Sequence, residues 1–245
     1  MKRRHFLKSS LITTAACALS PNYIIGQTNS ELPYEELIGK GKPFLYGTDY
    51  KLRLQAHIAF RQMQVAAKKS DISIKIVSSY RSYDHQKRIW ERKFKRNRAL
   101  GLTPIENMKK IIEYSTIPGT SRHHWGTEID IVDGRFINTP NLLSAKNFEQ
   151  GQPFHELKLW LHEYANAFGF YLAYTDTPSR KGFKYEPWHF SFKPLSKGYL
   201  KTYRTLDILK TLQAEKFVGS EHFTTEFINS YIDENILDIN PELLH

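Results

Sequence analysis

The chain has 245 residues, of which 40% are hydrophobic and 13% aromatic, and it carries a formal net charge of +10. This length and composition suffice for one substantial hydrophobic core with an appendage. They exclude a low-complexity chain and a repeat array. No apolar run is long enough for a membrane-spanning helix, so we expect no transmembrane segment in the mature chain.

Residues 1–26 have the pattern of a cleaved export signal rather than of a fold element. A basic head precedes a short, weakly apolar stretch and then small residues. The head, RRHFLK at residues 3–8, resembles the twin-arginine export motif. That resemblance implies a bacterial protein of the periplasm or cell envelope that crosses the inner membrane already folded. We expect cleavage after Ala18 or Gly26, with a lipid anchor on Cys17 as the alternative.

The first half of the mature chain alternates predicted helices and strands. Apolar residues at helical spacing predict a helix over residues 51–69, and alternation predicts a strand over residues 72–77. A basic amphipathic helix begins near Tyr83, followed by a shorter helix at residues 108–114 and a second strand at residues 127–132. The apolar residues behind these assignments are Leu54, Ile58, Ala59, Val65, Ala66, Ile72, Ile74, Ile76, Ile89, Trp90 and Phe94.

The basic helix carries seven of the chain's cationic residues between Lys87 and Arg98, against one acidic residue, Glu91. The simplest interpretation is a solvated helix face. The alternative is attraction to an anionic polymer or surface. Nucleic acid would fit the charge, but export from the cytoplasm argues against it, and we expect no nucleic-acid partner.

The second half predicts a third long helix that opens at Pro153 and ends at Gly169, since proline suits a first helical turn and glycine a helix end. Its apolar residues are Leu157, Leu161, Tyr164, Ala165 and Phe168. Strands are expected at residues 170–174 and 185–192, and two or three helices after residue 195. The predicted fold is therefore α+β, with a small, mostly antiparallel sheet and flanking helices. We divide the chain into a signal (1–26), a catalytic domain (27–195) and a C-terminal helical extension (196–245).

The stretch SRHHWGTEID, residues 121–130, concentrates groups that bind metals. Side chains alternate faces along a strand, so Asp130 points away from the core-facing isoleucines on either side of it, and Glu128 shares its face. Gly126 allows a sharp turn. That turn brings either His123 or His124 back toward Asp130.

A second segment, EPWHF at residues 186–190, offers the remaining groups. Regular strand alternation would place Glu186 and His189 on opposite faces, but Pro187 makes a local bend plausible. Two histidines and one carboxylate with an open fourth position are how proteins hold a catalytic zinc ion. A carboxylate that does not bind the metal can act as the base for the attacking water.

These motifs resemble the D-alanyl-D-alanine carboxypeptidase family of zinc peptidases, which includes vancomycin-resistance D,D-carboxypeptidases and L,D-carboxypeptidases. The family pattern S-x-H-x-x-G-x-A-x-D is followed by E-x-W-H, and both occur here in order except at the alanine position of the first. An upstream segment, SSYRSYDHQ, resembles the family's S-x-Y-R-S-x-x-x-Q. The resemblance covers roughly residues 45–195. The matching positions are Arg81, Gln86, Ser121, His123, Gly126, Asp130, Glu186, Trp188 and His189.

The resemblance implies a role for each matching residue. One zinc ion would be bound by His123, Asp130 and His189, and Glu186 would be the catalytic base. Arg81 would act with it at the catalytic centre, holding the substrate carboxylate or stabilising the oxyanion. The implied substrate contacts are Gln86, Ser121 and Trp188, although core packing is the alternative role of Trp188. His124 is then the histidine of the pair that does not bind metal.

The implied reaction is hydrolysis of the terminal peptide bond of a peptidoglycan stem peptide by a metal-activated water. We rank D,D-carboxypeptidase activity ahead of L,D-carboxypeptidase and endopeptidase activity. A non-haem iron oxygenase fits poorly, because its H-x-D spacing is absent and Glu186 would have no role. A non-catalytic cell-wall binding module would be indicated by loss of a ligand or of the base, and all four residues are present.

One position departs from the family pattern. Glu128 replaces the small residue two before the aspartate. It shares a strand face with Asp130, roughly 6–7 Å along the strand. We expect it to pair with Arg81 or another base, to narrow the substrate pocket, or to lie at the surface at the rim of the site. The departure bears on substrate specificity more than on metal binding.

Overall fold

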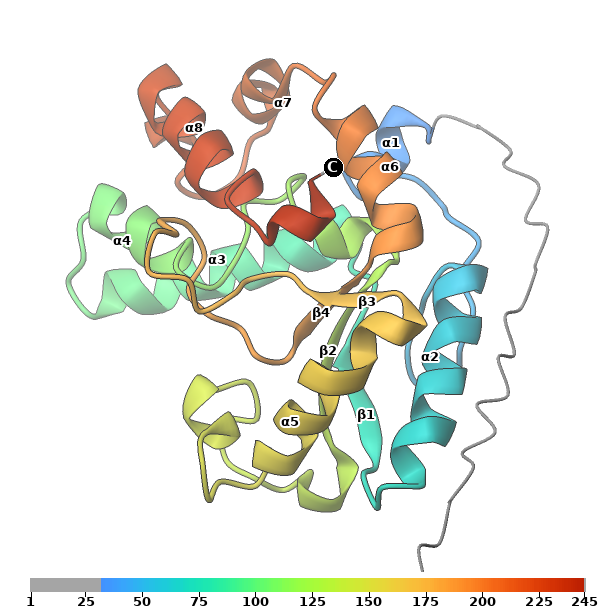
Figure 1. Cartoon of the computed structure of the whole chain (residues 1–245). Coiled ribbons are helices and arrows are strands. Elements are labelled where there is room, and N and C mark those ends of the chain that lie inside the picture. Colours follow the sequence, from blue (N-terminus) through green and yellow to red (C-terminus); the bar gives the residue numbers. More distant parts are fainter. Residues whose placement is uncertain (1–31, 245) are drawn as a thin grey trace, which may run out of the picture. The chain divides into compact units, whose positions relative to one another are not determined.

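The computed structural model describes residues 32–244 (Figure 1). The predicted export signal and Cys17 lie outside the described residues. Within residues 32–244, no helix has both the length and the apolar character required to cross a membrane.

A four-stranded sheet lies at the centre of the fold, in the order β1-β2-β4-β3, and each neighbouring pair is antiparallel. The predicted α+β fold with a small antiparallel sheet and flanking helices is therefore confirmed. The strands are β1 (Ile74–Ser78), β2 (Glu128–Asp133), β3 (Phe170–Leu172) and β4 (His189–Phe192). The α-helices are α1 (Tyr34–Leu37), α2 (Leu54–Lys68), α3 (Tyr83–Ala99), α4 (Pro104–Ile111), α5 (His155–Tyr164), α6 (Lys193–Tyr203), α7 (Ile208–Ala214) and α8 (Thr225–Tyr231).

The two faces of the sheet differ in chemistry. Ile129 of β2 is paired with Phe190 of β4, and both are buried in the core that α2 and α5 cover. The residues on either side of this pair point to the opposite face and are polar, and they too are buried. They are Glu128, Asp130, His189 and Ser191. Because buried polar groups need partners, this second face is where a functional site is expected.

Helix α2 forms as predicted, but it buries a different set of residues. Leu54 and Val65 are 47% and 60% exposed, whereas Phe60 and Met63 are fully buried. The buried set also repeats at helical spacing, with Ala56 one turn before Phe60. Aromatic and long apolar side chains remove more apolar surface from water, so they determine which face packs on the sheet.

Helix α3 begins at Tyr83 as predicted, because the Ser82 hydroxyl accepts a hydrogen bond from the backbone N–H of His85. Trp90 and Phe94 are buried, but Ile89 is only partly so and lines a cavity. Helix α4 starts several residues before the predicted helix.

The start of α4 is a capping box that hydropathy alone did not indicate. The Thr103 hydroxyl and the Glu106 carboxylate each bond to the other's backbone N–H, and Pro104 occupies the first helical position. Helix α5 begins at His155, two residues after the predicted opening. A short 3₁₀ turn (Ala165–Phe168) follows it, and Gly169, at φ +80°, ends the segment.

Helices α6, α7 and α8 confirm the predicted C-terminal helical extension; the exact boundary at residue 195 stays a prediction. Figure 1 shows α7 and α8 on the same side of the molecule as α3 and α4, and α6 beside α1. The Tyr203 hydroxyl donates to the carbonyl of Gly119 (3.0 Å), and the Tyr231 hydroxyl accepts from the N–H of Ile117 (3.1 Å). The extension therefore holds the segment that leads into the histidine motif.

Candidate active site

Strand pairing brings the two motifs together. In the register of β2 and β4, Asp130 lies opposite His189, and on its other side it faces Ser78 of β1. Strand β4 begins only at His189, so the predicted strand over residues 185–192 is wrong in its first part. Instead, the N–H of His189 bonds to the carbonyl of Glu186 (3.0 Å) in a turn. A regular strand would have placed Glu186 and His189 on opposite faces of the sheet. The turn brings them together instead, with Glu186 Oε2 3.2 Å from His189 Nδ1.

The histidine motif forms a short 3₁₀ helix (Arg122–Trp125) directly before β2. Gly126 ends it at φ +70°, a conformation that favours glycine, and a side chain there would collide with Leu45. The reversal places His123 Nε2 3.3 Å from Asp130 Oδ2. The turn predicted at Gly126 thus brings His123 to Asp130.

His124 has a different environment. Its Nε2 accepts from the N–H of Gly119 (3.2 Å), and its Nδ1 lies 2.6 Å from the carbonyl of Arg81. Both ring nitrogens are therefore occupied, so the ring ties two backbone segments together and has no lone pair for a metal. Burial lowers the pKa of His124 to about 3, which keeps the ring neutral. The side chain is fully buried, and it does not belong to the metal-binding cluster.

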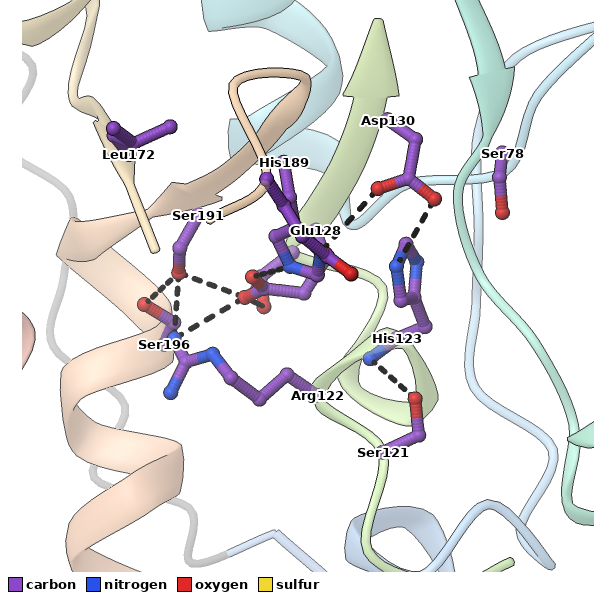
Figure 2. Close-up of polar contacts among 12 residues, drawn as sticks. Ser78, Ser121, Arg122, His123, Glu128, Asp130, Leu172, His189, Ser191 and Ser196 are labelled. Carbon is purple, nitrogen blue, oxygen red and sulfur yellow. Dashed lines mark hydrogen bonds and ion pairs between the residues drawn. The ribbon is translucent and has the colours of Figure 1, made fainter. Parts of the chain in front are cut away.

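The side chains of His123, Asp130 and His189 converge from two strands and the 3₁₀ turn (Figure 2). One potential ligand atom from each lies within 4.8 Å of the others, and all three residues are buried. The set contains two imidazoles and one carboxylate, the donor types typical of a catalytic zinc site.

Hydrogen bonds from behind the cluster make it fit a metal ion. His123 Nδ1 lies 2.7 Å from the carbonyl of Ser79, an acceptor, so Nδ1 carries the proton and Nε2 presents its lone pair to the cluster. His189 Nε2 lies 2.9 Å from a carboxylate oxygen of Glu128, which leaves Nδ1 facing the cluster. Asp130 Oδ1 is buried without a hydrogen-bond partner among the described residues. A cation at this point would satisfy all three groups.

The cluster also shifts the pKa values of its members. Burial, with the nearby charge of Arg81, lowers the pKa of His123 to about 4. Burial alone would lower the pKa of His189, but the carboxylates of Glu128, Glu186 and Asp130 outweigh it and raise that pKa to about 9. Burial raises the pKa of Glu186 above its ordinary value. A carboxyl group with a raised pKa is a better proton acceptor once ionised.

Arg81 is anchored at the edge of the cluster. Its Nη2 donates to Asp130 Oδ2 (2.8 Å) and to the hydroxyl of Ser78 (2.8 Å). Gln86, predicted as a substrate contact, is fully buried and does not line the cavity. Its amide N–H donates to the carbonyl of Thr116 (2.9 Å), and its oxygen lies 3.5 Å from Arg81 Nη1. Gln86 therefore supports Arg81 and the adjoining cavity wall from behind.

A cavity of about 590 Å³ opens onto the cluster. Ser121 and Trp188, for which substrate contact stays a prediction, line it, but Trp188 is only 4% exposed and also packs against Phe148. Trp125 does not line it and belongs to the core.

Sequence reasoning missed several lining residues: Ser78, Lys93, Arg122, Tyr174 and Phe183. The sequence could have indicated Lys93, because it follows His85 and Ile89 at intervals of four residues and so shares their face of α3. All three residues line the cavity. No such pattern indicated Tyr174. It lies just past β3, where its ring packs edge-on against the His189 imidazole at 4.8 Å between centroids.

Glu128 is neither at the rim nor paired with Arg81. It is fully buried, and the base with which it pairs is Arg122, whose Nη2 lies 3.3 Å from Glu128 Oε1. Burial opposes its ionisation, but Arg122 and the hydrogen bonds from His189 and Ser191 prevail and lower the pKa of Glu128 to about 2. The cavity does not include Glu128.

Comparisons with known proteins agree with the motifs. The VanY D-alanyl-D-alanine carboxypeptidase family profile matches residues 49–195. The chain is 27% identical over 142 residues to a D-alanyl-D-alanine carboxypeptidase of Enterococcus faecalis, covering 58% of this chain and 48% of that one. It is 29% identical over 147 residues to a bifunctional D-Ala-D-Ala dipeptidase and carboxypeptidase, VanXYC, of Enterococcus gallinarum, covering 59% and 70% respectively. The chain thus spans about half the length of the first of these relatives.

Solved structures share the fold. VanYB in complex with D-alanine-D-alanine is 21% identical, with a TM-score of 0.53 over 72% of this chain and 92% of that chain. A variant of the vancomycin-resistance D,D-pentapeptidase VanY in complex with Zn(II) is also 21% identical, with a TM-score of 0.51 over 70% and 89%.

Proposed function

This chain belongs to the VanY family of D-alanyl-D-alanine carboxypeptidases, and we propose that it is a zinc-dependent D,D-carboxypeptidase acting on peptidoglycan stem peptides. One observation carries the proposal. The Glu186 carboxylate lies 3.2 Å from His189 Nδ1, beside the His123–Asp130–His189 cluster, and lines a substrate-sized cavity. A metal-binding cluster with an adjacent carboxylate outside it is the arrangement that hydrolysis by an activated water requires.

Each member of the cluster has a role in this proposal. Zinc bound by His123, Asp130 and His189 would supply a Lewis acid that polarises the scissile carbonyl and lowers the pKa of water. Glu186 accepts a proton from the attacking water. It then donates that proton to the departing amine of the terminal residue as the C–N bond breaks. No covalent intermediate with the protein is needed.

Arg81 acts next to the reacting carbonyl. Its guanidinium is held beside the metal-binding cluster by Asp130 and Ser78. That position suits stabilisation of the oxyanion that develops on the scissile carbonyl. Gln86 keeps Arg81 in place, and Ser121 and Trp188 contact the substrate along the cavity wall.

The terminal carboxylate of the substrate needs a cation of its own. Arg81 is paired with Asp130 and Arg122 with Glu128, whereas Lys93 forms no salt bridge in the part of the chain described. Lys93 lines the cavity. We assign it to the carboxylate of the residue that is released. A peptide ending in D-Ala-D-Ala meets these requirements, and one relative of the same fold is described as bound to that dipeptide.

The test is release of D-alanine from a synthetic stem pentapeptide ending in D-Ala-D-Ala, measured with the purified, zinc-loaded protein. We expect release that stops on chelation and returns with added zinc. Release of intact D-Ala-D-Ala would indicate a peptidyl-dipeptidase instead, and cleavage only of a tetrapeptide an L,D-carboxypeptidase. Absence of cleavage of any stem peptide or crosslink, with zinc bound, would replace the proposal by a cell-wall binding role.

Such a substrate places the protein in the bacterial cell envelope, which agrees with the export signal predicted at residues 1–26. Residues 1–26 fused to a reporter that fluoresces in the periplasm only when exported folded would test the twin-arginine route. Mutating both Arg3 and Arg4 to lysine should retain the reporter in the cytoplasm. Export of that variant at the original level would contradict the route.

A further inference from the structure

Glu128 and its partners form a second polar group directly behind His189 (Figure 2). In the register of β2 and β4, the pair Glu128–Ser191 lies next to the pair Asp130–His189 on the same face. The His189 ring therefore lies between carboxylates on two sides. Its Nδ1 is 3.3 Å from Asp130 Oδ1, and its Nε2 is 2.9 Å from Glu128 Oε2.

We propose that Glu128 is a positioning residue that fixes His189 in the orientation and tautomer required to bind the metal. A neutral imidazole carries one proton, and the hydrogen bond made by one nitrogen decides whether the other has a free lone pair. A carboxylate can only accept, so Glu128 keeps the proton on His189 Nε2. The lone pair of Nδ1 is then directed at Asp130. The inference rests on the proposed metal-dependent function.

The two oxygens of Glu128 have separate partners, which distinguishes this role from a simple buried ion pair. Oε2 bonds to His189. Oε1 receives the other three donors: the Ser191 hydroxyl at 2.7 Å, the Thr127 hydroxyl at 3.1 Å and Arg122 Nη2 at 3.3 Å. The contacts to Oε1 orient the carboxylate and offset the cost of burying its charge. These contacts leave Glu128 Oε2 available to accept the hydrogen bond from His189.

Arg122 supports the same interpretation. Two of its nitrogens, Nε and Nη1, are buried without partners among the described residues. Its Nη2 donates to the Ser191 hydroxyl (2.6 Å) and lies 3.3 Å from Glu128. A guanidinium placed only to satisfy a core carboxylate would be expected to pair with it through two nitrogens. Here a single nitrogen is used, which compensates charge while leaving Glu128 Oε2 to His189.

The effect of this arrangement is measurable as metal affinity. Hydrogen-bond partners of metal-binding histidines typically change metal affinity by about 10–100-fold when removed. We expect Glu128→Ala to raise the zinc dissociation constant by about that factor, measured by competition with a chromogenic chelator. Glu128→Gln should have a smaller effect, because its amide oxygen can still accept from Nε2. The visible spectrum of the cobalt(II)-substituted protein should shift in Glu128→Ala.

Ser196→Ala is the matched control. Ser196 lies on α6 and is fully buried, and its hydroxyl bonds to Ser191 (2.7 Å). Its loss removes one buried hydrogen bond near the group but none made by Glu128 or His189. We expect Ser196→Ala to bind zinc with the affinity of the unmodified protein. Affinity in Glu128→Ala equal to that of the unmodified protein, with an unchanged cobalt spectrum, would overturn the proposal.

A second measurement covers the case in which Glu128→Ala fails to fold. Nitrogen-15 NMR of the histidine side chains in the zinc-loaded, unmodified protein should show the His189 proton on Nε2. A proton on Nδ1 would overturn the proposal without any variant. Both readouts are independent of turnover. If the unmodified protein binds zinc in this manner but cleaves no peptide, the proposed function fails and the role of Glu128 stands.

Discussion

His189 lies directly opposite Asp130 in the antiparallel pairing of β2 and β4, and its Nδ1 is 3.3 Å from Asp130 Oδ1. The two motifs that carry these residues are separated by more than fifty positions in the chain, yet one ladder of backbone hydrogen bonds sets their spacing. A rigid sheet, rather than a loop, therefore positions two of the three proposed ligands.

The assignment of Glu186 as the base leads to the first prediction. Glu186→Gln should retain zinc and lose turnover, because an amide cannot accept the proton of the attacking water. The expected loss in kcat is at least about 100-fold, the usual contribution of a general base. Zinc content and D-alanine release should be measured on the same preparation. Glu226→Gln, on the exposed start of α8, is the control and should remain active. Retained turnover in Glu186→Gln would remove this residue as the base.

The ligand assignment leads to the second prediction. His189→Ala should lower zinc affinity by more than the roughly 10–100-fold expected for loss of a hydrogen-bond partner, because it removes a ligand itself. Equilibrium dialysis with metal analysis measures this directly. His162→Ala, an exposed histidine on α5, should bind zinc normally. Equal zinc content in both variants would refute the assignment of His189.

The third prediction concerns pH. Burial lowers the pKa of Lys93 to about 8; the nearby Glu186 carboxylate opposes this shift, and neighbouring arginines add smaller contributions to it. The ammonium is charged below this pH and neutral above it, so its attraction to the substrate carboxylate should weaken as the pH rises through about 8. KM should therefore increase between pH 7 and 9 in the unmodified protein. In Lys93→Met, KM should be high already at pH 7 and change less.

Two further variants make this test specific. Lys93→Arg keeps its charge at pH 9. Its KM should therefore stay low and change less between pH 7 and 9 than that of the unmodified protein. Lys95→Met removes an exposed cation from the same helix, outside the cavity, and should behave like the unmodified protein. An identical KM profile in Lys93→Met and the unmodified protein would exclude Lys93 as the carboxylate partner.

The fourth prediction tests the C-terminal extension. The Tyr231 hydroxyl accepts from the N–H of Ile117 and bonds to the hydroxyl of Thr120 (2.7 Å). Tyr231→Phe leaves this buried N–H without a partner, which should lower the free energy of unfolding by about 1–3 kcal/mol. Urea denaturation measures the change. Tyr164→Phe, at a tyrosine that is 48% exposed, should have little effect. Equal stability of the two variants would show that the Tyr231 hydroxyl does not stabilise this segment.

Part of this site follows from local sequence rules. Alternation along β2 predicts that Asp130 faces away from Ile129, and Gly126 predicts the reversal that returns His123. These inferences hold because they depend on backbone geometry over a few residues. Backbone geometry does not decide between His123 and His124, since either side chain could reach Asp130. The contacts of His124 with the nearby Gly119 and with Arg81, which is distant in sequence, decide between them.

Other features depend on tertiary packing that periodicity cannot reveal. The buried face of α2 was misassigned because two sets of apolar residues repeat at helical spacing, and Phe60 and Met63 prevail through their size. The partners of Glu128 were ambiguous because Arg122 is reached only when η1 (Arg122–Trp125) folds back beside β2. Tyr174 reaches the cavity through strand order, which a single sequence does not specify.

The central claim is best tested by mass spectrometry of defined muropeptides incubated with the zinc-loaded protein and, in parallel, with its Glu186→Gln variant. We expect the pentapeptide to lose one alanine with the unmodified protein and to remain intact with Glu186→Gln, while the tetrapeptide is unchanged in both. An intact pentapeptide in the presence of bound zinc, or equal cleavage by the two proteins, would contradict the assignment of this chain as a zinc D,D-carboxypeptidase.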